Sequence, residues 1–153
     1  MNFNSNNNFS INTWMNIETN AAVADYIYGI YKNTLGGQFS YFLMLDSTNV
    51  GYSVGVNCGG STWPMIHYSV SNWIQATLVY SYPSITLYIK GSLIGYLNYN
   101  YPTAANSSGN LTFGALGAYS HCYRGFIDDV RIYSRTLTQD EVTALYHDGG
   151  FSN

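Results

Sequence analysis

Acidic side chains are the first residues to consider for chemistry, and this sequence offers few of them. Asp and Glu together number eight among 153 residues, and the two glutamates are Glu18 and Glu141. Cleavage of a glycosidic bond usually requires two carboxyl groups that flank the bond. The adjacent acids Asp128 and Asp129 would point to opposite faces of a strand, and Glu141 fits a helix cap. The spacing of the acids therefore predicts no hydrolytic pair.

The other reactive side chains also lack a recognisable arrangement. The three histidines share no spacing typical of zinc ligands. A group of His67, Tyr68 and Gln75, which could act as in a glycan lyase, is not supported by any spacing. We therefore expect no catalytic residues and a protein that is not an enzyme.

Charged residues make up only 8% of the chain, and the net charge is -3. The five basic residues are scattered and form no patch that could neutralise phosphates, so we expect no nucleic-acid partner. No apolar run approaches the roughly 20 residues of a membrane helix, so we expect no membrane insertion. This chain begins without the basic start and apolar core of a signal peptide. We expect an extracellular surface or a virion released by lysis as its location.

Short runs of alternating apolar and polar residues recur along the chain, as is typical of β-strands. The 16 tyrosines and 15 glycines fit the same class, since tyrosine suits a pleated surface and glycine suits tight turns. In one run Ile85, Leu87 and Ile89 should face the core, before a hairpin turn at Lys90-Gly91-Ser92. We expect strands over 9–17, 26–32, 39–45, 50–56, 65–70, 73–80, 84–90, 93–99, 111–118 and 125–134.

Only the C-terminus has the pattern of a helix. Thr138 and Glu141 fit a capping box that would begin it, and Gly149 is placed to end it. The expected apolar face consists of Val142, Leu145 and Tyr146. The sequence therefore predicts an all-β, antiparallel β-sandwich with one short C-terminal helix. We divide the chain into an Asn-rich N-terminal segment, residues 1–8, and one domain over residues 9–153.

The end of the chain carries a longer motif, RGFIDDVRIYSRTLTQDEVTALY, at residues 124–146. It resembles the end of laminin-G-like domains, which belong to the concanavalin A-like lectin and glucanase jelly rolls. In that family a last strand G-x-I-D-D-V-R-I-Y is followed by N/S-R-x-L and a short helix ending L-Y. Residues 9–17, 71–81 and 84–95 resemble further family segments in the same order. The resemblance implies a jelly-roll fold, but the family contains lectins, adhesion modules and glycan-cleaving enzymes.

The N-terminal segment departs from this family. Family domains usually open with a further strand that pairs beside the final one, and residues 1–8 do not match it. Without such a partner the final strand, 125–134, would expose unpaired backbone groups, which promotes aggregation. We therefore predict that it is paired on both sides. The second partner would be residues 2–8, a strand of another subunit in a homo-oligomer, or a segment of a longer parent chain.

Counting the strands alternately up and down assigns the connecting loops to two ends of the sandwich. One end is uncharged and rich in aromatic and amide side chains, which can stack on sugar rings and hydrogen-bond to sugar hydroxyls. We predict a ligand-binding site there, formed by Asn57, Trp63, Tyr82 and Tyr101. The alternative is that these side chains only pack within their loops.

The other end is acidic, and Asp46 and Asp128 are its candidate metal ligands. Carboxylates suit hard cations, and the resemblance implies calcium because some family members hold this ion at a loop rim. Asp128 shares an alternating strand face with Phe126, Val130 and Ile132, so we expect it to point inward. A buried carboxylate needs a partner, and the alternative to calcium is that Asp128 accepts hydrogen bonds from backbone N–H groups of a neighbouring loop.

The same count places the two cysteines, Cys58 and Cys122, at opposite ends. A disulfide requires α-carbons within about 7 Å, so we expect free thiols.

These features favour a non-catalytic carbohydrate-binding or adhesion module whose partner is a glycan or surface polysaccharide. The alternative is a structural or decoration protein of a virus particle, in a capsid, fibre or tail, that uses the sandwich for subunit contacts. The uncharged aromatic end favours the first, and the absence of a signal peptide and of the family's first strand favours the second.

Overall fold

The predicted strands are present in the structure with bounds close to those expected, except that the strand expected over 111–118 is described only as Leu111–Phe113 and residues 115–118 lie outside the described residues. The computed structural model describes residues 8–17, 27–33, 39–48, 51–57, 66–70, 72–98, 110–114 and 125–149. The elements in this part of the chain are β1 (Phe9–Ile17), β2 (Ile27–Asn33), β3 (Phe39–Thr48), β4 (Gly51–Asn57), β5 (Ile66–Val70), β6 (Ile74–Ser81), β7 (Ser84–Ile89), β8 (Ser92–Asn98), β9 (Leu111–Phe113), β10 (Gly125–Tyr133) and α1 (Gln139–Asp148).

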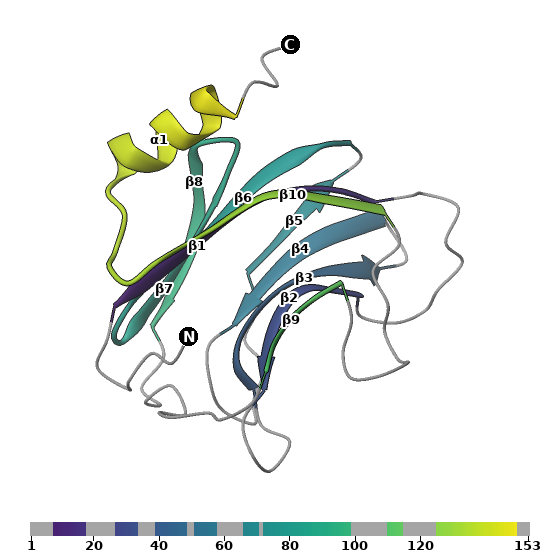
Figure 1. Cartoon of the computed structure of the whole chain (residues 1–153), viewed down its shortest axis with the longest axis horizontal. Coiled ribbons are helices and arrows are strands. Elements are labelled where there is room, and N and C mark those ends of the chain that lie inside the picture. Colours follow the sequence, from purple (N-terminus) through teal and green to yellow (C-terminus); the bar gives the residue numbers. More distant parts are fainter. Residues whose placement is uncertain are drawn as a thin grey trace.

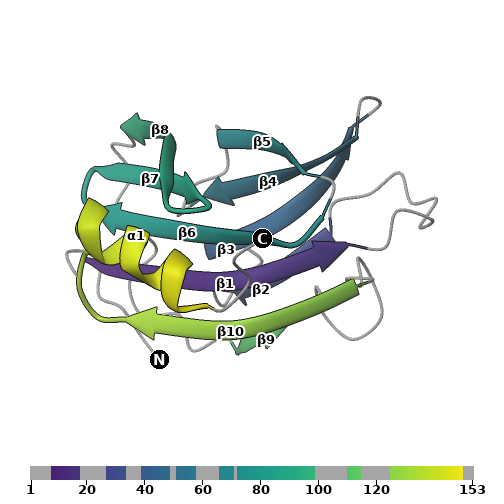
Figure 2. The ribbon, with the colours of Figure 1, turned by 90° about the horizontal axis from the view of Figure 1, so that it is seen from above.

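The strands form two antiparallel five-stranded sheets that lie face to face (Figure 1). One sheet has the order β10-β1-β6-β7-β8, and we call it the helix-side sheet because α1 lies across its outer surface (Figure 2). The opposite sheet has the order β5-β4-β3-β2-β9. The antiparallel β-sandwich with one C-terminal helix, predicted from the sequence, is confirmed.

The core lies between the two sheets and is built from alternate residues of each strand. On β7, Ile85, Leu87 and Ile89 face inward and are at most 2% exposed, as predicted. The inward residues of β1, namely Phe9, Ile11 and Met15, join them, and Ile30 and Leu43 come from the opposite sheet. Full burial of one such side chain contributes about 1.5–3 kcal/mol to the free energy of unfolding.

The predicted turn between β7 and β8 consists of Lys90 and Gly91. Their φ angles are 51° and 76°, and positive φ at both central residues is the geometry that continues the twist of a two-residue hairpin. Gly91 also packs against α1: a β-carbon added there would lie 3.3 Å from the α-carbon of Thr143. A side chain at this position would therefore push the helix away from the hairpin.

The outer face of the helix-side sheet is also buried beneath α1, and several of its buried residues are polar. Asn12, Gln75 and Thr77 are fully buried. The Nε2 group of Gln75 donates to Asn12 Oδ1 at 2.6 Å, and the Thr77 hydroxyl donates to the same oxygen at 2.8 Å. The Gly91 N–H donates to Gln75 Oε1 at 3.0 Å, and Gln139 Nε2 of α1 donates to the Gly91 carbonyl at 2.6 Å. This network, which we call the polar layer, connects β1, β6, the turn between β7 and β8, and α1.

The predicted capping box begins α1. The Thr138 side chain accepts a hydrogen bond from the Glu141 N–H, and the Glu141 carboxylate accepts one from the Thr138 N–H. Val142 and Leu145 bury the apolar face of α1, as predicted. They pack in a cluster that includes Val79 of β6. The capping box therefore stabilises the start of α1, and apolar packing holds the helix against the sheet.

The end of α1 depends on close contact with β1. Gly149 is the C-cap, as predicted, but its φ of -68° is not left-handed. A β-carbon there would overlap the indole of Trp14, whose ring stacks with Tyr146 at a centroid distance of 5.8 Å. Glycine is required here because the backbone approaches an aromatic ring.

A β-bulge interrupts the pairing of β1 with β10. The register contains the pairs Asn12–Arg131 and Trp14–Asp128, so β10 has two residues where β1 has one, Thr13. Asp129 lies in this interval with a φ of 47°. A bulge of this kind adds a residue to one strand and changes which side chains point inward.

The bulge overturns the orientation expected for two side chains of β10. Ile127, Val130 and Ile132 pack against the core, whereas Phe126 is 60% exposed and Asp128 is exposed. The prediction that Phe126 and Asp128 point inward is therefore wrong. Strict alternation over 125–134 cannot reveal an extra residue in the middle of the strand.

β10 forms one edge of the helix-side sheet, and within the described ranges its strand partner is β1 alone. The expected second partner, residues 2–8, lies outside the described residues apart from Asn8, so pairing on both sides stays a prediction. The edge carries an ion pair, with Arg131 Nε 2.7 Å from Asp129 Oδ1. Charges and bulges are features that discourage uncontrolled pairing of an edge strand.

Candidate functional site

Two of the predicted ligand-binding residues lie in the described structure. Asn57 ends β4, and Tyr82 lies in the turn between β6 and β7. The arrowheads of β4 and β6 point the same way (Figure 2), so these two positions belong to the same end of the sandwich. Trp63 and Tyr101 lie outside the described residues. The site therefore stays a prediction, and we call its location the Tyr82 end.

The turn that carries Tyr82 is anchored by buried aromatic rings. Tyr80 is 1% exposed and packs on Phe9 with ring centroids 5.2 Å apart. Beyond this anchor Tyr82 is 46% exposed and Pro83 is also exposed. No charged residue occurs between Gln75 and Tyr88. An exposed aromatic ring on a firmly held, uncharged turn can stack on the C–H face of a sugar while its hydroxyl forms a hydrogen bond.

The candidate metal ligands come from different sheets. Asp46 pairs with Ser53 in the opposite sheet, and Asp128 lies in β10 of the helix-side sheet. The Oδ1 atom of Asp128 accepts a hydrogen bond from the Asp129 N–H at 2.7 Å. Among the described residues, no group of three or more His, Cys, Asp or Glu side chains could hold a metal ion. Calcium binding by Asp46 and Asp128 stays a prediction.

The group His67, Tyr68 and Gln75 is not assembled as a lyase site would require. Gln75 is buried in the polar layer beneath α1. Tyr68, in contrast, is 38% exposed on β5 of the opposite sheet. Cys58 and Cys122 lie outside the described residues, so their expected free thiols also stay a prediction.

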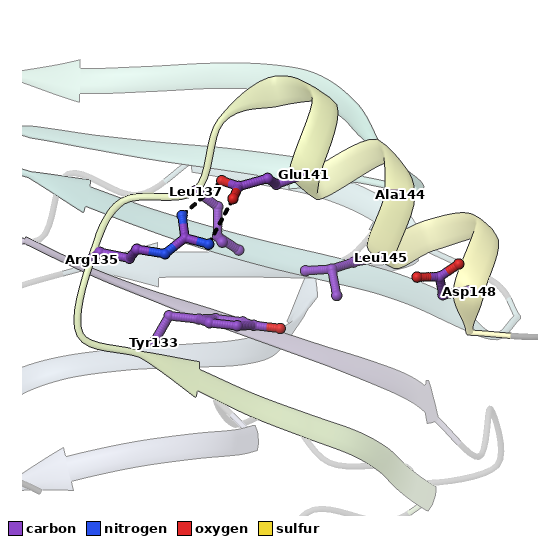
Figure 3. Close-up of a pocket in the computed structure, with 7 residues that line it drawn as sticks. All are labelled: Tyr133, Arg135, Leu137, Glu141, Ala144, Leu145 and Asp148. Atoms are coloured by element: carbon purple, nitrogen blue, oxygen red, sulfur yellow. Dashed lines mark hydrogen bonds and ion pairs between the residues drawn. The ribbon is translucent and has the colours of Figure 1, made fainter.

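The structure contains a groove that the sequence did not predict. It lies between α1 and the end of β10 (Figure 3) and has a volume of about 180 Å³. We call it the helix groove. Its lining residues are Tyr133, Arg135, Leu137, Glu141, Ala144, Leu145 and Asp148.

An ion pair forms one side of the helix groove. Arg135 Nη1 is 2.8 Å from Glu141 Oε2, and Nη2 is 2.6 Å from Oε1. This bidentate geometry fits a planar guanidinium to a carboxylate. The hydrogen bonds from Arg135, with a further one from the Thr138 N–H, lower the pKa of Glu141 to about 2, and Glu141 raises the pKa of Arg135. Both groups are therefore charged at neutral pH, and together they carry no net charge.

An aromatic ring and a second carboxylate complete the helix groove. The Arg135 guanidinium carbon lies 6.0 Å from the centre of the Tyr133 ring. Figure 3 shows Tyr133 running beneath α1 towards Leu145, with Asp148 near the other end of the helix. The sequence pattern assigns Glu141 to the cap alone and gives Arg135 no role. The groove exists only because α1 folds back over β10, and spacing along the chain does not reveal that contact.

Comparison with known proteins agrees with the fold. A family model described as the concanavalin A-like lectin/glucanases superfamily matches residues 1–143. This match confirms the resemblance inferred from residues 124–146 and the upstream segments. No curated protein sequence matches the chain. No helix among the described residues is long and apolar enough to cross a membrane.

Several solved structures share the fold at low sequence identity. Domain 4 of AbnA, an extracellular arabinanase from Geobacillus stearothermophilus in complex with arabinotriose, has a TM-score of 0.69 and 18% identity over 92% of this chain and 66% of that one. A heptameric SAP-like pentraxin from Limulus polyphemus has a TM-score of 0.71 and 14% identity, over 95% and 77%. The binding domain of botulinum neurotoxin DC in complex with SialylT has a TM-score of 0.73 and 17% identity, over 97% and 37%. The chain is thus shorter than each of these structures.

Proposed function

Because the chain belongs to the concanavalin A-like lectin/glucanase superfamily, we propose that it is a non-catalytic carbohydrate-binding or adhesion module. The exposed Tyr82 on its uncharged, anchored turn is the observation that carries this proposal. The arabinanase domain in complex with arabinotriose and the toxin domain in complex with SialylT support the choice of a glycan as ligand. The position of such a module would be an extracellular surface.

The proposed site at the Tyr82 end consists of Asn57, Trp63, Tyr82 and Tyr101. The aromatic side chains would stack on sugar rings, and the Asn57 amide would bond to hydroxyl groups. Each such contact would contribute about 1 kcal/mol if it is similar in strength to an aromatic pair. Binding by one site of this kind would be weak, so several copies acting together would be needed for tight attachment.

A glycan array, screened with and without calcium, tests this function directly. We expect binding to one class of neutral or sialylated glycan, reduced roughly fivefold by Tyr82→Ala if the ring contributes about 1 kcal/mol. Trp63→Ala should abolish most of the remaining binding. Phe126→Leu is the matched control, because it removes an exposed ring of β10 outside the Tyr82 end. Undiminished binding by Tyr82→Ala and Trp63→Ala would refute the site, and no bound glycan on a broad array would refute the function.

A second candidate function is a structural role in an assembly such as a virus particle, and the edge of β10 favours it. Within the described ranges this edge pairs on one side only, so a strand from another subunit could extend the sheet. Sedimentation over a wide range of protein concentrations tests this role. A stable oligomer would support it. A monomer at all concentrations would exclude it.

A further inference from the structure

We propose that the helix groove is a second binding site, which holds a single uncharged sugar unit. The proposal rests on the proposed function for its class of ligand, but it concerns different residues. The groove lies between α1 and β10, whereas Tyr82 lies in the turn between β6 and β7. A ligand could therefore occupy either site without the other.

The size of the helix groove suits one sugar ring. Its volume is about 180 Å³. Pockets for drug-sized ligands are larger, at about 300–1,000 Å³. Leu137 and Leu145 form an apolar base, and both are less than 9% exposed. The Tyr133 ring packs against these leucines and supplies an aromatic surface beside them.

Arg135 provides hydrogen-bond donors that are already positioned. A guanidinium has five N–H groups. Two of them donate to Glu141 and a third donates to the Thr136 carbonyl at 3.0 Å, so two remain available among the described contacts. Because Glu141 holds the guanidinium plane in place, binding a ligand would cost little additional side-chain ordering.

Asp148 provides an acceptor at the other end of the helix groove (Figure 3). It lies in the last turn of α1, where the helix dipole disfavours a negative charge. No hydrogen bond or ion pair to its carboxylate occurs within the described part of the chain. A ligand hydroxyl group that donates a hydrogen bond to the Asp148 carboxylate would stabilise its negative charge.

These charges select the class of ligand. The Arg135–Glu141 pair is neutral overall and Asp148 is negative, so the helix groove disfavours phosphate and other anions through like-charge repulsion. A divalent cation would require several oxygen ligands, and Asp148 is the single carboxylate in the groove that is not paired with Arg135. A sugar ring presents hydroxyl groups that both donate and accept, which matches donors at Arg135 and an acceptor at Asp148.

Titration of ¹⁵N-labelled protein with single neutral sugars tests this assignment by nuclear magnetic resonance. The probes are glucose, galactose, mannose, arabinose and N-acetylglucosamine, each added to high millimolar concentration, with inorganic phosphate as the anionic probe. We expect at least one sugar to cause saturable shifts of the amides of Leu137, Ala144 and Leu145, and phosphate to cause none. Shifts confined to other parts of the protein with all five sugars would overturn the proposal.

Three variants make the test specific to the helix groove. Asp148→Asn removes the acceptor charge and should weaken binding at least fivefold, whereas Asp140→Asn, the same change in the first turn of α1, should not. Ala144→Met fills the groove from an exposed position with another good helix former, so it should block the site without unfolding α1. Unchanged affinity in both Asp148→Asn and Ala144→Met would refute the assignment.

The two sites can fail separately. If sugar binding is lost in Tyr82→Ala but unchanged in Ala144→Met, the proposed function stands and the helix groove is not a site. If sugar binding to the helix groove persists in Tyr82→Ala and is lost in Ala144→Met, the second site is established whatever the outcome at the Tyr82 end.

Discussion

The two faces of the helix-side sheet are both buried, but by different chemistry. The inner face packs apolar residues such as Ile11, Leu78 and Leu87 against the opposite sheet. The outer face places the polar layer, including Asn12 and Gln75, beneath α1, beside a small apolar cluster that contains Val79. Apolar packing is non-directional and supplies most of the folding free energy. Hydrogen bonds are directional, so we infer that the polar layer fixes the position of α1 on the sheet, and with it the helix groove, more closely than the apolar contacts do.

The largest effect should follow a cavity on the inner face. Leu87→Ala removes a fully buried side chain from the centre of β7. We expect the free energy of unfolding to fall by about 2–5 kcal/mol, measured by denaturant titration. The same substitution at Leu93, which is 54% exposed on β8, should lower the free energy of unfolding much less. Equal losses in the two variants would contradict the view that inner-face packing dominates stability.

A smaller effect should follow disruption of the polar layer. Gln75→Leu keeps the volume but removes the partners of Asn12, Thr77 and the Gly91 N–H. Unsatisfied buried groups of this kind cost about 1–3 kcal/mol in total stability. We expect the amides of α1 to exchange with solvent faster than in the parent protein, while the core strands retain their relative protection.

The control for Gln75→Leu is Thr86→Val, which changes a half-buried hydroxyl on β7 outside the polar layer. Thr86→Val should leave the hydrogen exchange rates of the α1 amides unchanged. A Gln75→Leu variant in which α1 and the core strands lose protection equally would show that the polar layer supports the whole fold and does not specifically position the helix.

The smallest effect concerns the ion pair at the helix groove. The pKa of Glu141 falls from an ordinary 4.5 to about 2 in the folded state, mainly through Arg135. A lowered pKa stabilises the fold above the ordinary value, and this stabilisation disappears as the pH falls towards 2. Glu141→Gln should therefore lower the melting temperature at pH 7 but make little difference at pH 2. A melting-temperature difference that is the same at both pH values would exclude this linkage.

The inner face of the helix-side sheet was predictable from the sequence, and most of its outer face was not. Alternation with period two identifies Ile85, Leu87 and Ile89 because one residue in two must face the core. Alternation along β1, where Ile11 and Met15 face inward, assigns Trp14 to the outer face, although contacts with α1 bury it. That burial depends on a helix more than 120 residues later, and no local pattern records the contact.

In the candidate sites, too, local strand patterns were predictable and contacts between distant elements were not. Strand alternation placed Asn57 and Tyr82 at one end of the sandwich, since the order of antiparallel strands determines which loops meet. The orientation of Asp128 was predicted wrongly because a single bulge residue, Asp129, changes the face of every side chain before it. The helix groove was missed because its residues belong to two elements whose packing is tertiary.

The central claim is that this domain binds a glycan without cleaving it, and one measurement tests both parts. The glycan selected on the array is titrated into the purified protein by calorimetry, and the same mixture is then analysed by mass spectrometry after prolonged incubation. We predict saturable binding that Tyr82→Ala weakens, with the glycan recovered intact. The absence of any binding heat would contradict the claim that the domain binds a glycan. Release of shorter sugars would contradict the claim that it does not cleave one, provided that a substitution in this chain suppresses the release.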